Sequence, residues 1–208
     1  MSITWDTRRF DAALAATLGK SKREFGVVLR EQARGVVRRV IQMTPPKTKG
    51  AGTTTVKADF KKIFRAAPRS QAVFEHPKDI HARYRSKTTG RINPRSRKQL
   101  IPVLREELIP FRNEQLSHVG FLKSGWAMAA ERLGLRMPAF AQLPAPGDVV
   151  MELGGDLLRV EFANQVKYAA AVRGLARAMQ AALISQAGAM ERRLASALKQ
   201  SAVLAGFR

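Results

Sequence analysis

The chain has 208 residues, 45% of them hydrophobic, which suffices for the core of one ordinary domain and excludes a wholly disordered chain. Its 37 lysines and arginines exceed its 16 aspartates and glutamates, and the net charge of +21 favours nucleic acid, an acidic protein surface or an anionic membrane as partner. No cysteine is present, which excludes disulfides, thiolate zinc sites and thiol nucleophiles. Because neither a signal peptide nor a membrane-spanning run is visible, we expect a protein made in a reducing cytoplasm, with no membrane partner.

The positive charge is concentrated in the middle of the chain. Residues 47–100 hold 15 basic and 3 acidic side chains, compared with 9 and 4 in residues 1–46 and 13 and 9 in residues 101–208. We therefore expect three parts. Residues 1–46 form the N-terminal helical part of the core, residues 47–100 a basic arm, and residues 101–208 the remainder of the core.

An amphipathic helix is predicted over residues 21–43, with a shorter helix before it. Ser21 and Glu24 have the spacing of a capping box, and Pro45 and Pro46 end the pattern because proline cannot donate a helix hydrogen bond. The apolar residues recur at intervals of three and four: Phe25, Val28, Leu29, Ala33, Val36, Val37, Val40 and Ile41. This spacing predicts one apolar face that packs on the core.

Residues 47–100 are predicted to form an extended arm or long loop. After one short amphipathic stretch around Phe60, apolar residues become so sparse between His76 and Lys98 that burial cannot offset the entropy of ordering the chain. We expect this part to become ordered against a partner, docking through its cations. These are Lys78, Arg83, Arg85, Lys87, Arg91, Arg95, Arg97 and Lys98.

Helical patterns return beyond residue 100. A short helix is expected over residues 100–108, and a longer one over residues 114–133, which Gly134 would end. The last element is a long helix over residues 174–202, whose apolar stripe contains no internal proline.

A β-hairpin is predicted between these helices. Residues 148–153 and 157–162 alternate polar and apolar side chains around Gly154-Gly155-Asp156. The predicted fold class is therefore α+β: two long amphipathic helices packed on a small antiparallel sheet, with a long basic extended insertion.

The histidines give little support for a metal site. His76 and His81 lie near Glu75 and Asp79, but their spacing of five differs from the i, i+4 spacing of a helical zinc pair. The surrounding positive charge also repels cations. We therefore expect no metal and no cofactor.

Basic proteins often cleave the nucleic acid that they bind, so a nuclease is the enzyme class to test first. Metal-dependent nucleases need clustered carboxylates beside the scissile phosphate. Asp156 and Glu161 resemble part of such a hairpin site, but Ala163 stands where a lysine is expected. We therefore expect no catalytic residues and no enzymatic activity.

The basic arm has two interpretations. Its cations can neutralise phosphates and give sequence-independent, salt-sensitive binding to duplex nucleic acid. They can equally dock on acidic neighbours in a protein assembly. Tyr84 is the only aromatic residue between His76 and Lys98, which argues against single-strand binding by base stacking.

Three short motifs occur in order along the chain. The first helix ends at Thr44 and Pro45. Gly120, Leu122 and Trp126 form a Gly-x-Leu-x-x-x-Trp pattern, and Asn164 and Tyr168 form an Asn-x-x-x-Tyr-Ala pattern. Trp126 and Tyr168 are expected as large core anchors, and Asn164 is expected to bond backbone groups where a strand gives way to a helix.

These motifs resemble the tail-component family of long-tailed bacteriophages, which includes tail-completion and head–tail connector proteins. The likeness covers the first helix and the chain after about residue 115. The long segment between the Thr-Pro and Gly-x-Leu motifs departs from the family, in which a short loop joins them. The segment from Gly120 to Leu133 is also predicted to be a helix here and not a strand.

The resemblance implies a non-enzymatic structural protein of the virion neck or tail, made in the host cytoplasm. Such a protein would assemble as a homo-oligomeric ring and dock on the portal, adaptor, tail terminator or tail tube, with the arm contacting those neighbours or packaged DNA. Two alternatives stay open: a sequence-independent nucleic-acid-binding protein acting outside a virion, and a hydrolase acting on nucleic acid.

Overall fold

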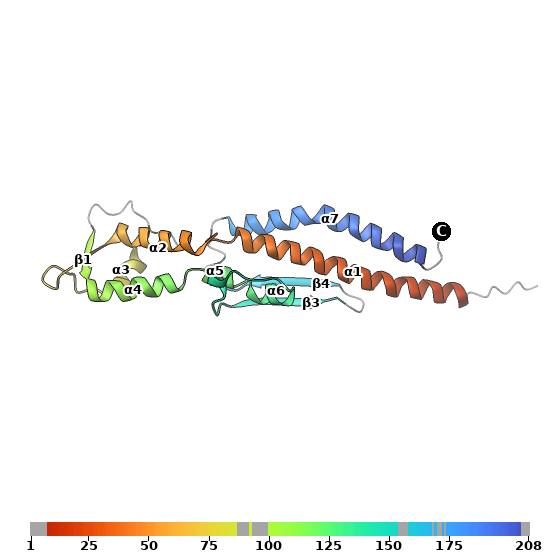
Figure 1. Cartoon of the computed structure of the whole chain (residues 1–208), viewed down its shortest axis with the longest axis horizontal. Helices are drawn as coiled ribbons and strands as arrows, with labels where there is room; N and C mark the ends of the chain where they lie inside the picture. The colour runs from red at the N-terminus through yellow and green to blue at the C-terminus, as the bar shows by residue number, and fades with distance from the viewer. Residues whose placement is uncertain are drawn as a thin grey trace, which may run out of the picture.

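The computed structural model describes residues 8–86, 92, 100–153, 158–167, 169, 172 and 174–204. The elements follow in this order: α1 (Arg8–Met43), α2 (Lys49–Ile63), β1 (Phe64–Ala67), α3 (Pro77–Tyr84), β2 (Ile101–Leu104), α4 (Arg105–Ser117), α5 (Phe121–Ser124), α6 (Ala127–Arg132), a 3₁₀ helix (Ala139–Ala141), β3 (Gly147–Glu152), β4 (Arg159–Asn164) and α7 (Leu175–Leu204). The class is α+β, as predicted. The molecule is elongated, with two halves along its long axis (Figure 1). We call α1, α5, α6, β3, β4 and α7 the body, and α2, β1, α3, β2 and α4 the lobe.

The body is organised around α1 and α7, which run antiparallel to each other (Figure 1). Gly35 of α1 faces Gln186 of α7, and the Ser201 hydroxyl of α7 donates a hydrogen bond of 3.0 Å to the Glu24 carboxylate of α1. The other side of α1 covers α6 and the β-hairpin. The fully or nearly fully buried side chains at the centre of this core include Val37, Val40, Trp126, Ala130, Leu133 and Ala182.

The predicted hairpin is confirmed as β3 and β4, which pair antiparallel from Gly147 opposite Asn164 to Glu152 opposite Arg159. Its inner face packs on the body core through Val149, Met151, Val160 and Phe162. The outer face is exposed and carries carboxylates on both strands. The predicted turn at Gly154-Gly155-Asp156 lies outside the described residues.

The lobe contains a two-stranded parallel sheet, in which Phe64 of β1 faces Ile101 of β2 and Ala67 faces Leu104. Helices α2, α3 and α4 pack around this pair (Figure 1). Its separate hydrophobic core consists of Phe60, Ile63, Phe64, Ile80, Ile92, Ile101, Val103 and Phe111. Because its members come from both sides of residue 100, the lobe forms only when distant segments meet.

The prediction of an extended arm over residues 47–100 is wrong for the part that the structure describes. Two helices and a strand occupy this segment, and Ile80 and Ile92 are buried. The apolar residues are sparse locally, but β2 and α4 supply the missing half of the core. The boundary at residue 100 is also misplaced, since β2 and α4 belong to the lobe.

Three predicted helices differ from the observed ones. The first helix already includes Arg8, so Ser21 lies buried within the helix and does not cap its start. Residues 101–104 form a strand, and α4 continues through Pro110. The single helix expected over 114–133 is divided into the end of α4, α5 and α6. Gly134 does follow α6 with the left-handed φ of +65° expected there, and the C-terminal helix is confirmed.

The chain passes between the body and the lobe twice, after α1 and after α4. Gly52 of α2 lies close to both crossings. A Cβ atom added there would be 2.5 Å from Val119 Cγ1 and 2.9 Å from Pro46 Cγ. Pro46 follows α1 and Val119 precedes α5, so the two crossings lie side by side.

Candidate functional site

The three sequence motifs meet in the body close to the lobe. At the end of α1, the Thr44 hydroxyl donates a hydrogen bond of 2.7 Å to the Val40 carbonyl and accepts one of 3.0 Å from Trp126 Nε1. Both side chains are buried, so Thr44 provides the partner that a buried indole N–H requires. Pro45 follows at the surface, at the first crossing to the lobe.

Asn164 joins the third motif to the second. It ends β4, and its Nδ2 donates a hydrogen bond of 2.7 Å to the Leu122 carbonyl in α5. Its Oδ1 accepts one of 3.1 Å from the Val166 backbone N–H. The expectation that Asn164 bonds backbone groups at the end of a strand is therefore confirmed. Tyr168 lies outside the described residues.

Two glycines allow these segments to approach one another. Gly120 has a φ of +104°, and a Cβ atom there would lie 2.2 Å from the Phe140 carbonyl oxygen. At Gly125, a Cβ atom would lie 2.2 Å from Asn164 Oδ1. The helix expected over residues 114–133 is interrupted at these points. We call Thr44, Gly120, Leu122, Trp126 and Asn164 the motif junction.

Lys123, inside the second motif, is a buried cation that the sequence did not reveal. Only 2% of the residue is exposed, and its Nζ lies 5.7 Å from the centre of the Phe140 ring. It forms no hydrogen bond or ion pair with another described residue. Burial lowers the pKa of Lys123, because the ammonium loses hydration that the protein does not replace. A lysine among apolar residues looks like a surface cation in the sequence, so no signal pointed to its burial.

The predicted docking cations lie only partly within the described structure. Lys78 and Arg83 are exposed on α3, where Arg83 pairs with Glu75, and Arg85 follows the helix. The remaining five, Lys87, Arg91, Arg95, Arg97 and Lys98, lie outside the described residues.

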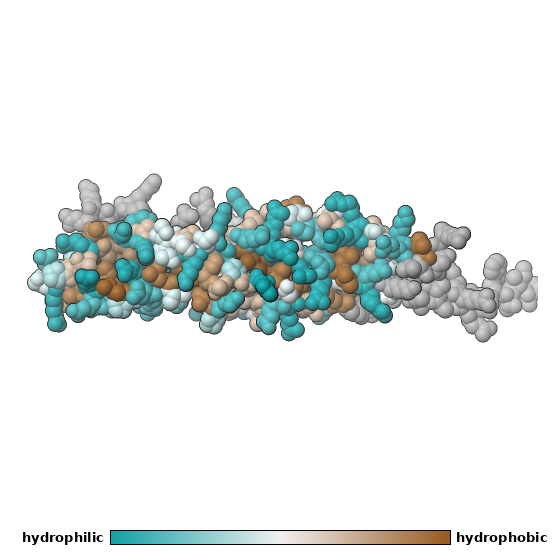
Figure 2. All heavy atoms as spheres, in the orientation of Figure 1, coloured by the Kyte–Doolittle hydropathy of each residue, from teal (hydrophilic) through white to brown (hydrophobic). Residues whose placement is uncertain are grey.

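Exposed cations nevertheless cover the lobe. Figure 2 shows hydrophilic side chains over much of the face in view. The lysines and arginines of residues 47–86 are all exposed: Lys47, Lys49, Lys57, Lys61, Lys62, Arg65, Arg69, Lys78, Arg83 and Arg85. Acidic side chains in the same segment are Asp59, Glu75 and Asp79. Helix α4 adds Arg105 and Arg112 together with Glu106, Glu107 and Glu114, so the lobe as a whole has a clear excess of positive charge.

The two histidines of the predicted arm have structural contacts in the lobe. His76 Nδ1 accepts a hydrogen bond of 3.1 Å from the Lys78 backbone N–H and so caps α3. His81 packs against Phe60 and Phe111, with ring centres 5.6 and 5.5 Å away. Burial, and secondarily Arg85, lower the pKa of His81. No group of three or more His, Asp or Glu residues suited to a metal ion occurs within the described ranges.

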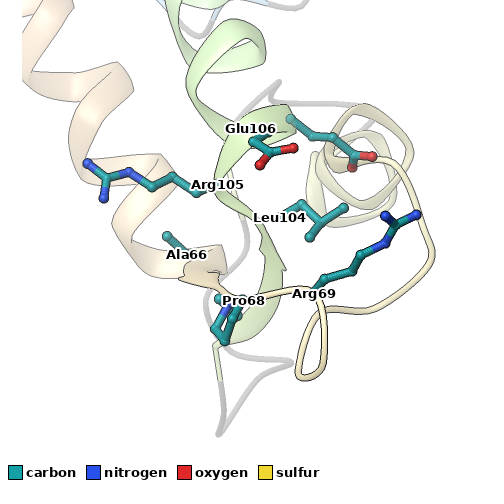
Figure 3. Close-up of a pocket in the computed structure, with 8 residues that line it drawn as sticks. Ala66, Pro68, Arg69, Leu104, Arg105 and Glu106 are labelled. Carbon is teal, nitrogen blue, oxygen red and sulfur yellow. The ribbon is translucent and has the colours of Figure 1, made fainter.

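A hollow of about 630 Å³ lies at the end of the parallel strand pair in the lobe. Figure 3 shows Arg69, Leu104 and Glu106 around it, with Arg105 extending in a different direction from Arg69. Arg69 and Arg105 are balanced there by Glu106 and Glu107, so the hollow has no excess of either charge and does not select an anion.

Comparisons with protein-family models, curated proteins and solved structures give no match. In the described part of the chain, no helix has the length and apolar character needed to cross a membrane.

Proposed function

We propose that this protein is a non-enzymatic structural component of the neck or tail of a tailed bacteriophage. In this role it completes the tail or connects head and tail, and copies of it assemble into a ring. Its neighbours are other virion proteins, namely the portal or adaptor, the tail terminator or the tail tube. The basic lobe, in place of the extended arm expected from sequence, is the docking element.

The observation that supports this proposal most is the meeting of the three motif segments. The motifs are separated by more than 70 and about 40 residues in the sequence, yet hydrogen bonds link Thr44 to Trp126 and Asn164 to Leu122. Of the residues that carry the family resemblance, Thr44, Leu122, Trp126 and Asn164 are thus joined in one structural unit. This unit fixes the end of α1 and the hairpin against each other.

The apolar residues exposed on α7 also favour an assembly. Leu183, Ile184, Leu198 and Val203 are each more than half exposed. Exposed apolar surface of this kind is typical of contacts with other proteins. A helix that runs the length of the body offers a long surface for such contacts.

The proposal is tested by light scattering coupled to size-exclusion chromatography, at low and high salt, followed by negative-stain microscopy. We expect one defined oligomer at both salt concentrations, with the appearance of a closed ring. A compact monomer at every protein concentration and in every buffer would contradict the proposal.

The exposed cations of the lobe support a second candidate function, sequence-independent binding to nucleic acid outside a virion. Duplex DNA added to the same chromatography distinguishes the two, because phosphate contacts release counterions and weaken steeply with salt. A monomer that elutes with DNA at low salt and separates at high salt favours this alternative. Under this alternative, the double variant Lys57→Glu and Lys61→Glu would lose DNA binding. Under the structural proposal, the ring assembles in the absence of DNA.

A further inference from the structure

The loop between β1 and α3 presents an exposed aromatic side chain. Phe74 is fully exposed, and Val73 beside it is 37% exposed. The loop backbone is nevertheless fixed, since the Val73 N–H donates a hydrogen bond of 2.9 Å to the Pro102 carbonyl and the Ala72 N–H one of 3.1 Å to the Pro68 carbonyl. Aromatic side chains are enriched in protein–protein interfaces, so a fully exposed phenyl ring on a fixed loop is a candidate anchor for such a contact.

An apolar groove lies in the other half of the molecule, between the β-hairpin and α7. It measures about 370 Å³ and is lined by Val150, Val160, Met179 and Leu183, of which Leu183 is 54% exposed. Its charged lining residues are Asp148 and Glu161, both acidic.

The charges around the groove suit a basic partner. Glu161 is paired with Arg159 at 2.7 Å, whereas Asp148 forms no ion pair with a described residue. With Glu152, strands β3 and β4 carry three carboxylates and the single cation Arg159. The lobe as a whole carries the opposite charge, with exposed cations such as Lys57 and Lys61 on α2, whereas in the loop itself Glu75 beside Phe74 is paired with Arg83.

A second apolar hollow, of about 350 Å³, is a less suitable site for this loop. It lies at the crossings between body and lobe and is lined by Pro46, Gly52 and Phe121 among others. Its surroundings include His118 and the exposed cations Lys47 and Lys49. The basic lobe that carries the loop would meet charge of its own sign there, so charge complementarity favours the groove on the hairpin.

We propose that Phe74 of one copy of the chain docks in the groove between the β-hairpin and α7 of a second copy. The inference rests on the proposed function, to which it adds the contact that joins neighbours in the ring. The loop lies at one end of the long axis and the groove lies in the body, so one chain cannot fill its own groove (Figure 1). The contact is therefore head-to-tail, and repeating such a contact produces a closed ring or a filament.

Site-specific cross-linking tests this contact, because the chain contains no cysteine. Two single variants, Gln71→Cys in the loop and Ala163→Cys in the groove, leave Phe74 and Leu183 unchanged. Both positions are exposed. When the two proteins are mixed and treated with a short bis-maleimide, we expect a cross-linked pair containing one copy of each, identified by mass spectrometry of the joined peptides.

The same cross-link is then measured with Phe74→Asp added to the loop variant. We expect its yield to fall at least about tenfold, because an anchor residue of the contact is lost and an acidic side chain faces Asp148. The matched control is Val27→Asp, which changes an apolar residue on α1 that is 62% exposed and lies outside the groove. This control is expected to leave the yield unchanged. Circular dichroism verifies that both variants are folded.

The remaining outcomes overturn the inference in distinguishable ways. If light scattering shows a ring but position 71 does not cross-link to position 163, the ring is retained and this contact is rejected. A cross-link from position 71 to Thr55→Cys instead would place the loop at the crossings. A cross-link to position 163 that Phe74→Asp does not weaken rejects Phe74 as the docking residue. A monomer without any cross-link rejects both the contact and the proposed function.

Discussion

The body buries its core between two long helices and a hairpin, whereas the lobe builds its core from short elements and aromatic rings. In the lobe, the Phe60 ring lies 5.5 Å from Phe64 and 5.3 Å from Phe111, centre to centre. In the body, the buried neighbours of Trp126 are mainly aliphatic, and the half-buried Phe162 ring lies 6.2 Å from it, centre to centre. Each half thus has its own core, and in the part of the chain that the structure describes two crossings join the halves. The comparison indicates two structural units, a body held together by long helices and a basic lobe, for which docking is the role that we propose.

The largest effects are expected from truncating one large side chain in each core. Trp126→Ala and Phe111→Ala should each lower the free energy of unfolding by about 3–5 kcal/mol, through lost burial and a residual cavity. Hydrogen exchange would show loss of protection mainly in α1 and α7 for the first variant, and in α2, α3 and α4 for the second. Equal loss in both halves for both variants would mean that the body and the lobe unfold as one unit.

Removing the hydroxyl of Thr44 should have the next largest effect. Thr44→Val leaves the buried Trp126 N–H without its acceptor, so the free energy of unfolding should fall by about 1–3 kcal/mol. Thr44→Ser keeps the hydroxyl and serves as the control, with a smaller loss expected. Guanidinium titration followed by tryptophan fluorescence measures both. No loss for the valine variant would contradict this role of the hydroxyl, and a loss for serine alone would assign the effect to the methyl group.

Replacing the buried Lys123 should stabilise the body. Lys123→Met keeps the length of the side chain and removes a desolvated charge, so we expect a gain of about 1 kcal/mol at neutral pH. Because the folded pKa is lowered, wild-type stability should rise with pH between that pKa and 10.5, the ordinary value, and the variant should lack this rise.

Urea titrations at several pH values up to 10.5 measure the difference in the free energy of unfolding between the wild type and Lys123→Met. The exposed Lys199→Met is the control, with a change within about 0.5 kcal/mol. A loss of stability in Lys123→Met would show that the ammonium makes a favourable contact.

The smallest effect should come from protonation of His81 in the lobe. Because its folded pKa is lowered, the unfolded chain binds the proton more tightly. The contribution of neutral His81 to the stability of the lobe is fully present above pH 6.5, the ordinary pKa of histidine. This contribution declines as the pH falls from 6.5 through the folded pKa. His81→Gln should remove this part of the pH dependence of lobe unfolding. An unchanged pH profile would assign the dependence to another group.

The elements that local spacing predicts well are those whose partners lie close in the sequence or whose pattern is long. Helices α1 and α7 show many turns of apolar periodicity, and the hairpin pairs neighbouring segments, so each was predicted. The lobe was missed because its strands lie far apart in the sequence, with Phe64 pairing to Ile101. A window around Phe60 or Ile80 contains too few apolar residues to predict a core without α4.

In the candidate site, too, some features follow from the local sequence and others depend on contacts between distant segments. Trp126 and Asn164 behave as expected of a core anchor and a backbone partner, because indole and amide groups have definite hydrogen-bonding needs. The contact between Trp126 and Thr44 was not predictable, since it depends on how α1 meets α6. The burial of Lys123 was not predictable either, because a single cation in a short helix gives no indication of which side of the helix is covered.

The neighbouring positions of the two crossings have a further consequence. With Pro46 and Val119 both beside Gly52, the lobe enters and leaves the body at nearly the same place. A segment attached in this way is geometrically an insertion in a surface connection of the body, which folds tolerate when the ends of the insert are close together. The lobe is thus exchangeable in principle: a short linker from Pro46 to Val119, or a different small domain, would fit the same opening while α1, α7 and the hairpin keep their packing.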